Sequence, residues 1–286
     1  LFCVPTALPC RSGAQQIADT GPVDPNALYT YWAGANDIFN YVGYASAGYI
    51  TSAQAQAFTG ATALNEVRQI GGLQAAGAKV IVVMNLPDIG RAPNFNNTEL
   101  FPTQASPAAA AAISGLTFVH NTTLNSGLAT LGDGIVPINV YAMFNEVLAD
   151  PSSYGFTNTN STACDLALSG GSSLFCTPAA YRSPDANETY VFADGVHPTG
   201  AAHRMVASVV VSTLTAPGQV SMASELPLQV YDDHSNVINN QIFGMDGDPR
   251  APGESNLYGN IGYSQTDFKA SGTTNEMDSD LFVATF

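Results

Sequence analysis

The stretch "ALYTYWAGANDIFNYV" (residues 27–42) changes character halfway along. Its first half is apolar and aromatic, which is typical of a strand buried in a sheet. It then breaks into "GAND" (residues 34–37) before apolar residues resume. Such an ending places backbone N–H groups and the Asn36 amide at the carboxyl edge of a sheet, where ligand sites of α/β proteins lie. The alternative is that Asn36 and Asp37 only turn the chain or cap a helix that begins at Ile38.

Apolar runs recur downstream and alternate with helix-like segments. Residues 79–86 (KVIVVMNL) and 135–141 (IVPINVY) predict two further strands, and the first is continuously apolar enough for a parallel sheet. Periodic, Ala-rich segments over roughly 52–76 and 106–130 predict helices, and residues 200–215 predict a helix after a Pro-Thr start. This alternation predicts a layered α/β domain with right-handed crossovers.

The amino-acid composition of the chain changes after Pro217. Residues 218–256 are rich in Asn, Asp, Gly and Pro, as a linker or surface segment would be. Residues 257–271 and 278–286 then alternate apolar with polar side chains and predict an antiparallel hairpin. The same alternation describes strands of a membrane β-barrel, so both interpretations of this tail stay open.

Composition excludes several classes of protein. Of the 286 residues, 45% are apolar, which rules out wholesale disorder, and 11% are charged, with a formal net charge of −15. That charge repels nucleic acid and anionic lipid surfaces, so we expect no nucleic-acid partner and favour a neutral one. It also suits a protein that acidity keeps soluble outside a cell.

The four cysteines form two close pairs in the sequence. Cys164 and Cys176 enclose a Gly- and Ser-rich segment and lack the Cys-x-x-Cys spacing of a zinc site. A local disulfide and an oxidising compartment are the preferred interpretation, and four unrelated free thiols are the alternative. Cys3 and Cys10 form the second candidate pair near the chain start.

We expect neither a transmembrane helix nor a signal peptide within this sequence. No apolar stretch reaches about 18 residues, so we expect no transmembrane helix. The first residue is Leu rather than Met, which indicates either that a leader was removed or that the chain is a fragment.

A second informative stretch is "YVFADGVHPTGAAHRM" (residues 190–205). Asp194 and His197 lie three apart on a Gly-containing loop, so the carboxylate can reach one ring nitrogen and leave the other free as a base. The alternative is a surface or capping contact. At the first stretch, Gly34 and Asn36 offer uncharged N–H donors, which suit an oxygen that becomes negative during acyl transfer.

Together, Gly-x-Asn-Asp after a strand and Asp-x-x-His-Pro before the last helix resemble the SGNH, or GDSL-type, serine esterases and lipases. The resemblance spans about residues 14–215 and is strongest to the esterase passenger domains of bacterial autotransporters. It implies a flavodoxin-like three-layer α/β/α sandwich that needs no metal or organic cofactor. It also implies that His197 is the base, that Asp194 is its acid partner, and that Gly34 and Asn36 form the oxyanion hole.

The sequence departs from the family at its nucleophile. That residue is the serine of a Gly-Asp-Ser motif after the first strand of the family's sheet, and no Gly-Asp-Ser occurs here. Ser114, Ser172 and Ser173 do not lie on a strand-to-helix elbow, so we expect none of them to substitute. The expectation is therefore an SGNH domain that begins after its nucleophile block and is inactive alone.

These observations define the predicted organisation of the chain. Residues 1–216 would form the hydrolase domain without its first strand, residues 217–256 a linker, and residues 257–286 the start of an autotransporter barrel. The function implied is hydrolysis of small-molecule or lipid carboxylic esters at the bacterial outer-membrane surface or outside the cell. A catalytically inactive, surface-displayed binding module on the same scaffold is the alternative. His120 and His203 are expected to be surface or packing residues, and no metal site is expected.

Overall fold

The computed structural model describes residues 13–19, 21–245, 253, 260–268 and 277–285. The chain divides into two compact units, Leu1–Val210 and Val211–Phe286. The first unit contains the parallel sheet and all four of the predicted site residues.

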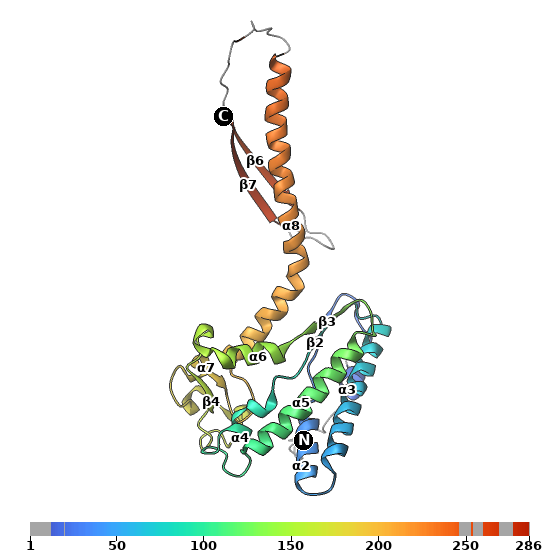
Figure 1. Cartoon of the computed structure of the whole chain (residues 1–286), viewed down its shortest axis with the longest axis vertical. Coiled ribbons are helices and arrows are strands. Elements are labelled where there is room, and N and C mark those ends of the chain that lie inside the picture. Colours follow the sequence, from blue (N-terminus) through green and yellow to red (C-terminus); the bar gives the residue numbers. More distant parts are fainter. Residues whose placement is uncertain (1–12, 20, 246–252, 254–259, 269–276, 286) are drawn as a thin grey trace. The chain divides into compact units, whose positions relative to one another are not determined.

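A parallel sheet lies at the centre of the first unit (Figure 1). Its strands are β1 (Leu28–Tyr31), β2 (Val80–Met84) and β3 (Ile135–Ile138), in that order. Both pairings, β1 with β2 and β2 with β3, are parallel. The three predicted strands and the α/β fold class are therefore confirmed, although each strand is shorter than its apolar run. Within the described residues β1 is an edge strand, and its Leu28 is 52% exposed.

Two long helices pack against one face of this sheet. They are α3 (Ser52–Ala75) and α5 (Pro107–Leu128), as predicted from the Ala-rich segments. Ile81 and Val83 of β2 join side chains of both helices in one buried cluster. Val82, which points to the opposite face because side chains alternate along a strand, is fully buried as well. Both faces of β2 are thus covered, as a layered α/β fold requires.

Side-chain caps fix where these two helices begin. At the start of α3, the Thr51 hydroxyl accepts a hydrogen bond from the Gln54 N–H, and the Gln54 side-chain oxygen accepts one from the Thr51 N–H. These two bonds form a complete capping box. Ser106 accepts from the Ala109 N–H at the start of α5, where Pro107 fits the first helical turn. The chain thus carries local start signals at both helices.

Among the described residues, the other helices of seven residues or more that lie wholly within the first unit are α1 (Gly13–Asp19), α2 (Ala35–Ser46) and α6 (Val140–Ala149), and the full extent of none of them was predicted from the sequence. Helix α2 begins within the "GAND" stretch, at Ala35, three residues earlier than the alternative that starts it at Ile38. The structure therefore puts Asn36 and Asp37 inside the first turn of a helix.

A smaller pair of parallel strands lies beside the part of the chain that holds Asp194 and His197. These are β4 (Asn158–Thr162) and β5 (Tyr190–Phe192). The first unit also contains six short elements among its described residues: η1 (Ile89–Arg91), α4 (Pro93–Asn96), η2 (Pro151–Tyr154), η3 (Ser173–Phe175), η4 (Pro178–Ala180) and α7 (Ala186–Thr189).

The last helix is much longer than predicted. From the sequence, this helix was expected to end near residue 215 and to be followed by a linker. In the structure α8 runs from Gly200 to Met245, with Pro217 and Pro227 inside it. Each proline lacks the backbone N–H that would bond within the helix, and its ring clashes with the preceding helical turn, so proline disfavours helix at that position. The residues around both prolines include many good helix formers, among them Ala, Leu, Gln and Glu, so the backbone continues as helix. The expected irregular segment is therefore helical as far as residue 245.

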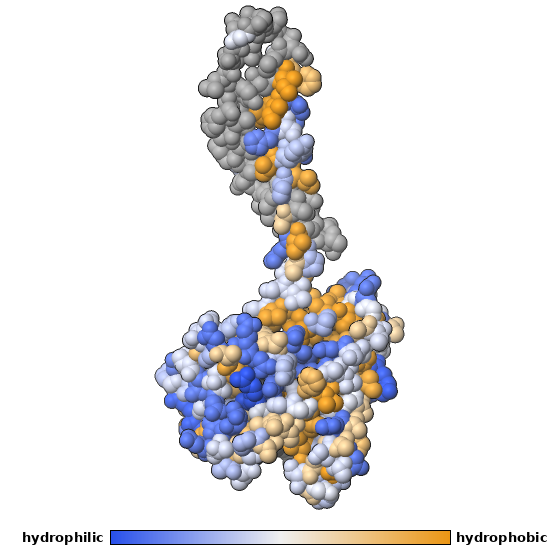
Figure 2. Space-filling model, viewed as in Figure 1, coloured by the Kyte–Doolittle hydropathy of each residue, from blue (hydrophilic) through white to orange (hydrophobic). Residues whose placement is uncertain are grey.

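The second unit also contains the predicted hairpin. Strands β6 (Asn260–Phe268) and β7 (Met277–Thr285) pair antiparallel, which confirms it. Figure 2 shows apolar side chains on the surface of α8 in this unit. Val220, Tyr231 and Phe243 of this helix are largely exposed. Among the described residues, no helix combines the length and the apolar character that crossing a bilayer requires.

Candidate active site

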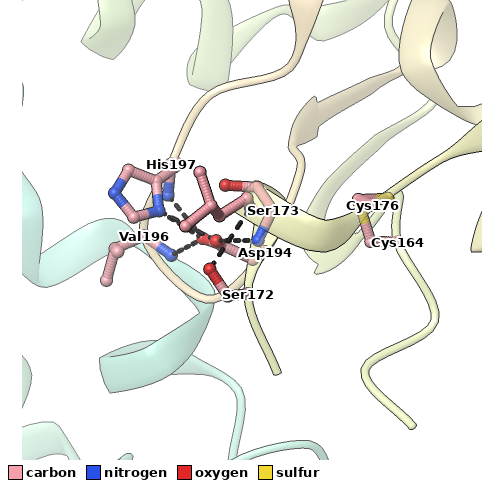
Figure 3. Close-up of polar contacts among 8 residues, drawn as sticks. Cys164, Ser172, Ser173, Cys176, Asp194, Val196 and His197 are labelled. Atoms are coloured by element: carbon pink, nitrogen blue, oxygen red, sulfur yellow. Dashed lines mark hydrogen bonds and ion pairs between the residues drawn. A yellow bond between two sulfur atoms is a disulfide. The ribbon is translucent and has the colours of Figure 1, made fainter. Parts of the chain in front are cut away.

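A tight loop after β5 holds Asp194 and His197 together. The Ala193 N–H donates to the His197 carbonyl (2.8 Å), and the Thr199 N–H donates to the Val191 carbonyl (2.9 Å), so the chain folds back on itself around the loop. The His197 ring nitrogen Nδ1 lies 2.8 Å from Asp194 Oδ2 and 3.0 Å from Oδ1 (Figure 3). The pair predicted from a spacing of three is thus formed.

Asp194 is a buried carboxylate with several donors. It is 3% exposed, and its Oδ1 accepts from the main-chain N–H groups of Val196 (3.0 Å) and His197 (2.8 Å). Its Oδ2 accepts from the Ser173 N–H at 2.7 Å. Burial by itself would raise the pKa of this carboxyl, but the hydrogen bonds from His197 and the main chain outweigh it and hold the pKa well below the usual range. Asp194 is therefore an anion at any pH near neutrality.

His197 presents its other ring nitrogen to solvent. Its side chain is 62% exposed although Nδ1 faces Asp194. The hydrogen bond to Asp194 raises the pKa of His197, and partial burial offsets only part of that rise. With Nδ1–H held by the carboxylate, Nε2 is free to accept a proton, which is the arrangement of a general base.

This pairing predicts a measurable titration shift. We expect the pKa of His197, followed by NMR of the imidazole, to lie above the ordinary value of about 6.5 in the wild-type chain and to fall in Asp194→Asn. The sign follows from the pair: the imidazolium gains stability from the anion below the unfolded-state pKa, and that gain is lost as the pH rises through the folded-state pKa. Asp133→Asn, which removes an exposed carboxylate of the same charge, is the matched control and should leave His197 unchanged. Equal titration curves for wild type and Asp194→Asn would contradict the assignment.

The second predicted group, Gly34 and Asn36, lies at the N-terminus of α2. Gly34 is the residue before the first helical residue and has φ of 103°, and its carbonyl accepts from the Ile38 N–H. Asn36 is exposed, and within the described residues its side-chain amide makes no hydrogen bond. The first N–H groups of a helix have no partner within the helix and favour negative charge. The free amide and these N–H groups together suit an oxyanion.

Two buried polar side chains, His120 and Glu66, lie directly behind Gly34, and their contact was not predicted from the sequence. His120 is fully buried and Glu66 is 4% exposed, and His120 Nε2 lies 3.1 Å from Glu66 Oε1. A Cβ added to Gly34 would lie 2.3 Å from that Nε2. Of the two expected alternatives, a surface residue or a packing residue, the structure shows that His120 is a packing residue. Its position under the "GAND" turn depends on contacts between distant segments, for which the sequence carries no local signal.

The structure connects the two motifs through neighbouring side chains, although no hydrogen bond joins Asn36 to His197. Phe39 of α2 contacts Phe95 of α4, with ring centroids 5.8 Å apart. The neighbouring Asn94 N–H donates to the carbonyl of Gly195 in the acid–base loop at 2.8 Å. Trp32, at the end of β1, makes an edge contact with His203 on α8. Helix α4 and the start of α8 thus bridge the two motifs within one unit.

Other candidate groups do not add to the site. Ser114 lies within α5 and its hydroxyl bonds to Asp88, so it is not a strand-to-helix nucleophile. In the described part of the chain, no group of three or more His, Cys, Asp or Glu side chains could hold a metal ion. A cavity of about 400 Å³ beside β3 is lined by Asn85, Asn139 and other residues, but none of the four predicted site residues lines it. We therefore assign no reactive role to that cavity.

The predicted local disulfide is present. Cys164 and Cys176 are bonded, with their Cα atoms 6.0 Å apart. The other predicted pair, Cys3 and Cys10, lies outside the described residues. The closed segment runs beside the acid–base loop and provides the Ser173 N–H that Asp194 accepts (Figure 3).

Comparison with known proteins shows the family to which the chain belongs. Residues 11–210 match the model of the GDSL-like lipase/acylhydrolase family. Similar curated proteins include an uncharacterized protein encoded in the trpE–trpG intergenic region of Pseudomonas putida, which is 30% identical over 246 residues (82% of this chain, 38% of that protein). Lipase 1 of Photorhabdus luminescens is 26% identical over 265 residues (72% of this chain, 39% of that protein). Esterase EstA of Pseudomonas aeruginosa is 30% identical over 213 residues (73% of this chain, 30% of that protein). The chain thus spans less than two fifths of the length of each of these relatives.

Proposed function

Because the chain belongs to the GDSL-like lipase/acylhydrolase family, we propose that it supplies the acid–base pair and the oxyanion donors of a carboxylic ester hydrolase. The reaction is acyl transfer through a serine nucleophile. His197 takes the proton of the serine hydroxyl as it attacks the ester carbonyl and returns that proton to the leaving alcohol. Asp194 fixes the ring and stabilises the imidazolium that forms.

The observation that carries this proposal is the Asp194–His197 pair. His197 is bound at Nδ1 by a buried carboxylate at 2.8 Å while its side chain is largely exposed, which is the geometry of a base that can accept the proton of the serine hydroxyl. A surface contact, the alternative interpretation, would not require an acid that is 3% exposed and accepts three main-chain N–H groups. Burying a carboxylate is costly unless it is paired and bonded in this way.

Gly34 and Asn36 are proposed as the oxyanion donors. The free amide of Asn36 and the N–H groups at the start of α2 favour an oxygen that gains negative charge in the transition state. They are neutral donors, so they stabilise that charge without forming an ion pair in the ground state.

We place the nucleophile outside residues 1–286. The sequence contains no Gly-Asp-Ser, and Ser114 is engaged inside a helix. The hydroxyls of Ser172 and Ser173 lie on the disulfide-closed loop, where the Ser172 hydroxyl accepts from the Leu174 N–H. On this proposal the ester hydrolase is a longer polypeptide that includes both the serine and this chain.

Small-molecule or lipid esters are the proposed substrates, and the outside of a bacterial cell or its outer-membrane surface is the proposed location. The disulfide between Cys164 and Cys176 suits an oxidising compartment, and a net charge of −15 disfavours nucleic-acid partners. Relatives named lipase and esterase in bacteria support the same substrate class.

The polypeptide of residues 1–286 should be inactive by itself. We expect it to hydrolyse p-nitrophenyl butyrate no faster than its His197→Ala variant, and a fluorophosphonate probe should label neither, because both lack the nucleophile. Turnover by residues 1–286 that a serine reagent abolishes would overturn the placement of the nucleophile.

The DNA upstream of the Leu1 codon provides the second half of this test. An in-frame Gly-Asp-Ser segment, together with hydrolysis by the longer product, would support the enzyme. A start codon at or near Leu1 and no hydrolysis by any product would contradict it and favour the inactive binding module.

A further inference from the structure

The disulfide-closed segment from Cys164 to Cys176 lies against the acid–base loop. The N–H groups of Ala163 and Cys164 donate to the carbonyls of Phe192 (2.8 Å) and Ala193 (2.9 Å), so the segment begins alongside the chain that leads into Asp194. Its far end returns at η3, where the Cys176 N–H donates to the Ser173 carbonyl (3.1 Å). The disulfide joins these two ends.

One backbone group of this segment bonds to the carboxylate of Asp194. The Ser173 N–H donates to Asp194 Oδ2 at 2.7 Å, and the same oxygen lies 2.8 Å from His197 Nδ1 (Figure 3). The other main-chain donors, Val196 and His197, bind Oδ1 and belong to the acid–base loop itself. Oδ2 is the carboxylate oxygen nearer to His197 Nδ1, and the main-chain donor that it binds, the Ser173 N–H, comes from a separate segment 21 positions away in sequence.

We propose that Ser173 is a positioning residue for the acid Asp194, acting through its main-chain N–H, and that the Cys164–Cys176 disulfide holds that N–H in place. The proposal rests on the proposed function only in giving Asp194 and His197 their catalytic roles. The contact itself is independent of any substrate. With two donors on Oδ1 and one on Oδ2, rotation of the carboxyl group about its Cβ–Cγ bond would break bonds on both oxygens. The Ser173 N–H thus keeps Oδ2 directed at the imidazole.

The contact uses the backbone, so a proline substitution can remove it without removing a side chain that bonds to Asp194. Ser173 is the first residue of η3, a position that tolerates proline because its N–H has no partner within the helix. Ser172 has φ of −134° and ψ of 140°, the extended conformation that a residue before proline adopts. Ser173→Pro therefore fits the local backbone and deletes the donor. Ser173→Ala, which keeps the N–H, is the matched control.

The first measurement is the titration of the Asp194 carboxyl by carbon-13 NMR in residues 1–286. Loss of one hydrogen bond to a carboxylate should raise the protonation midpoint of Asp194 by roughly 1–2 pH units in Ser173→Pro. Ser173→Ala should titrate as the wild type does. An unchanged midpoint in Ser173→Pro, or an equal rise in Ser173→Ala, would overturn the role of this N–H.

The second measurement tests the disulfide. In Cys164→Ala/Cys176→Ala, hydrogen exchange of the Ser173 amide should accelerate by roughly tenfold or more relative to the Val196 amide, because the segment can leave Asp194 without unfolding the acid–base loop. Equal exchange in both proteins would show that the loop stays in place without the disulfide. A variant that unfolds as a whole leaves the titration of Ser173→Pro, with its disulfide intact, to decide the proposal.

Both measurements use the chain without substrate or nucleophile. A failure of ester hydrolysis would therefore leave these results unchanged, and a failure of this inference would leave the proposed hydrolysis untouched.

Discussion

Gly34→Ala should lower the free energy of unfolding of the first unit by roughly 2–5 kcal/mol. Two effects add. A Cβ at position 34 would lie 2.3 Å from His120 Nε2 and 3.0 Å from Glu66 Oε1, distances that require the neighbours to move. The φ of 103° is also one that side-chain-bearing residues rarely adopt, so alanine would be strained there even with free space.

The neighbours of Gly34 cannot move cheaply. His120 is fully buried in α5, and its two ring nitrogens face Glu66 and Asn121. Displacing the imidazole would break these contacts inside the protein, where unpaired polar groups cost the most. We therefore expect the backbone at the start of α2 to shift instead, and Asn36 to shift with it.

Gly43→Ala is the matched control for this substitution. Gly43 lies in the same helix, its added Cβ meets nothing within 4 Å, and it has no positive φ. Alanine should stabilise α2 at that site by up to about 1 kcal/mol because of its higher helix propensity. Thermal unfolding followed by circular dichroism compares the two. A Gly34→Ala protein within about 0.5 kcal/mol of wild type, the usual range of a surface substitution, would contradict the tight packing behind the oxyanion turn.

A double variant identifies the obstacle. If His120 is what the new Cβ meets, Gly34→Ala should cost less in a His120→Ala background than in the wild type, since the clashing ring atoms are gone. Additive costs would place the strain in the backbone alone.

The structural features that could be predicted from the sequence are those that depend on residues close together in the chain. The run KVIVVMNL gave strand β2 in its parallel sheet, and the Ala-rich segments gave α3 and α5. The Asp194–His197 pair could be predicted as well, because a spacing of three in a tight turn leaves few alternatives. Each of these features is encoded within about one element of chain.

Contacts between segments that are distant in the chain could not be predicted from the sequence. Gly34, Glu66 and His120 meet only because β1, α3 and α5 pack together, and each side chain by itself has an ordinary explanation. The Ser173 N–H is a backbone group, so the identity of its side chain says nothing about its partner. The length of α8 was misjudged for a different reason. Proline is a strong local signal against helix, but it disturbs one turn, and the surrounding helix formers decide the rest.

The largest effect on rate is expected for His197→Ala. In the longer polypeptide that carries the proposed serine, kcat/KM for p-nitrophenyl butyrate should fall by about 10⁴-fold or more, because the serine then has no base. Asp194→Asn should lose about as much, since the ring of His197 would no longer be held in the reactive tautomer. Asn36→Ala should lose less, roughly 10²–10³-fold, the effect of removing one oxyanion donor.

Comparing the losses of the single and double variants shows whether Asp194 and His197 act as one unit or contribute independently to the rate. If Asp194 acts only through His197, the double variant Asp194→Asn/His197→Ala should be hardly slower than His197→Ala, whereas independent roles would multiply the two losses. His203→Ala is the matched control, because it removes a neighbouring histidine that contacts Trp32 and is placed outside the acid–base pair. That variant should keep its rate within a few-fold of wild type. A folded His197→Ala protein whose kcat/KM falls by less than about tenfold would remove His197 from the proton path, since a general base typically contributes about 10²–10⁴-fold. The contact between His197 and Asp194 would then be a structural one.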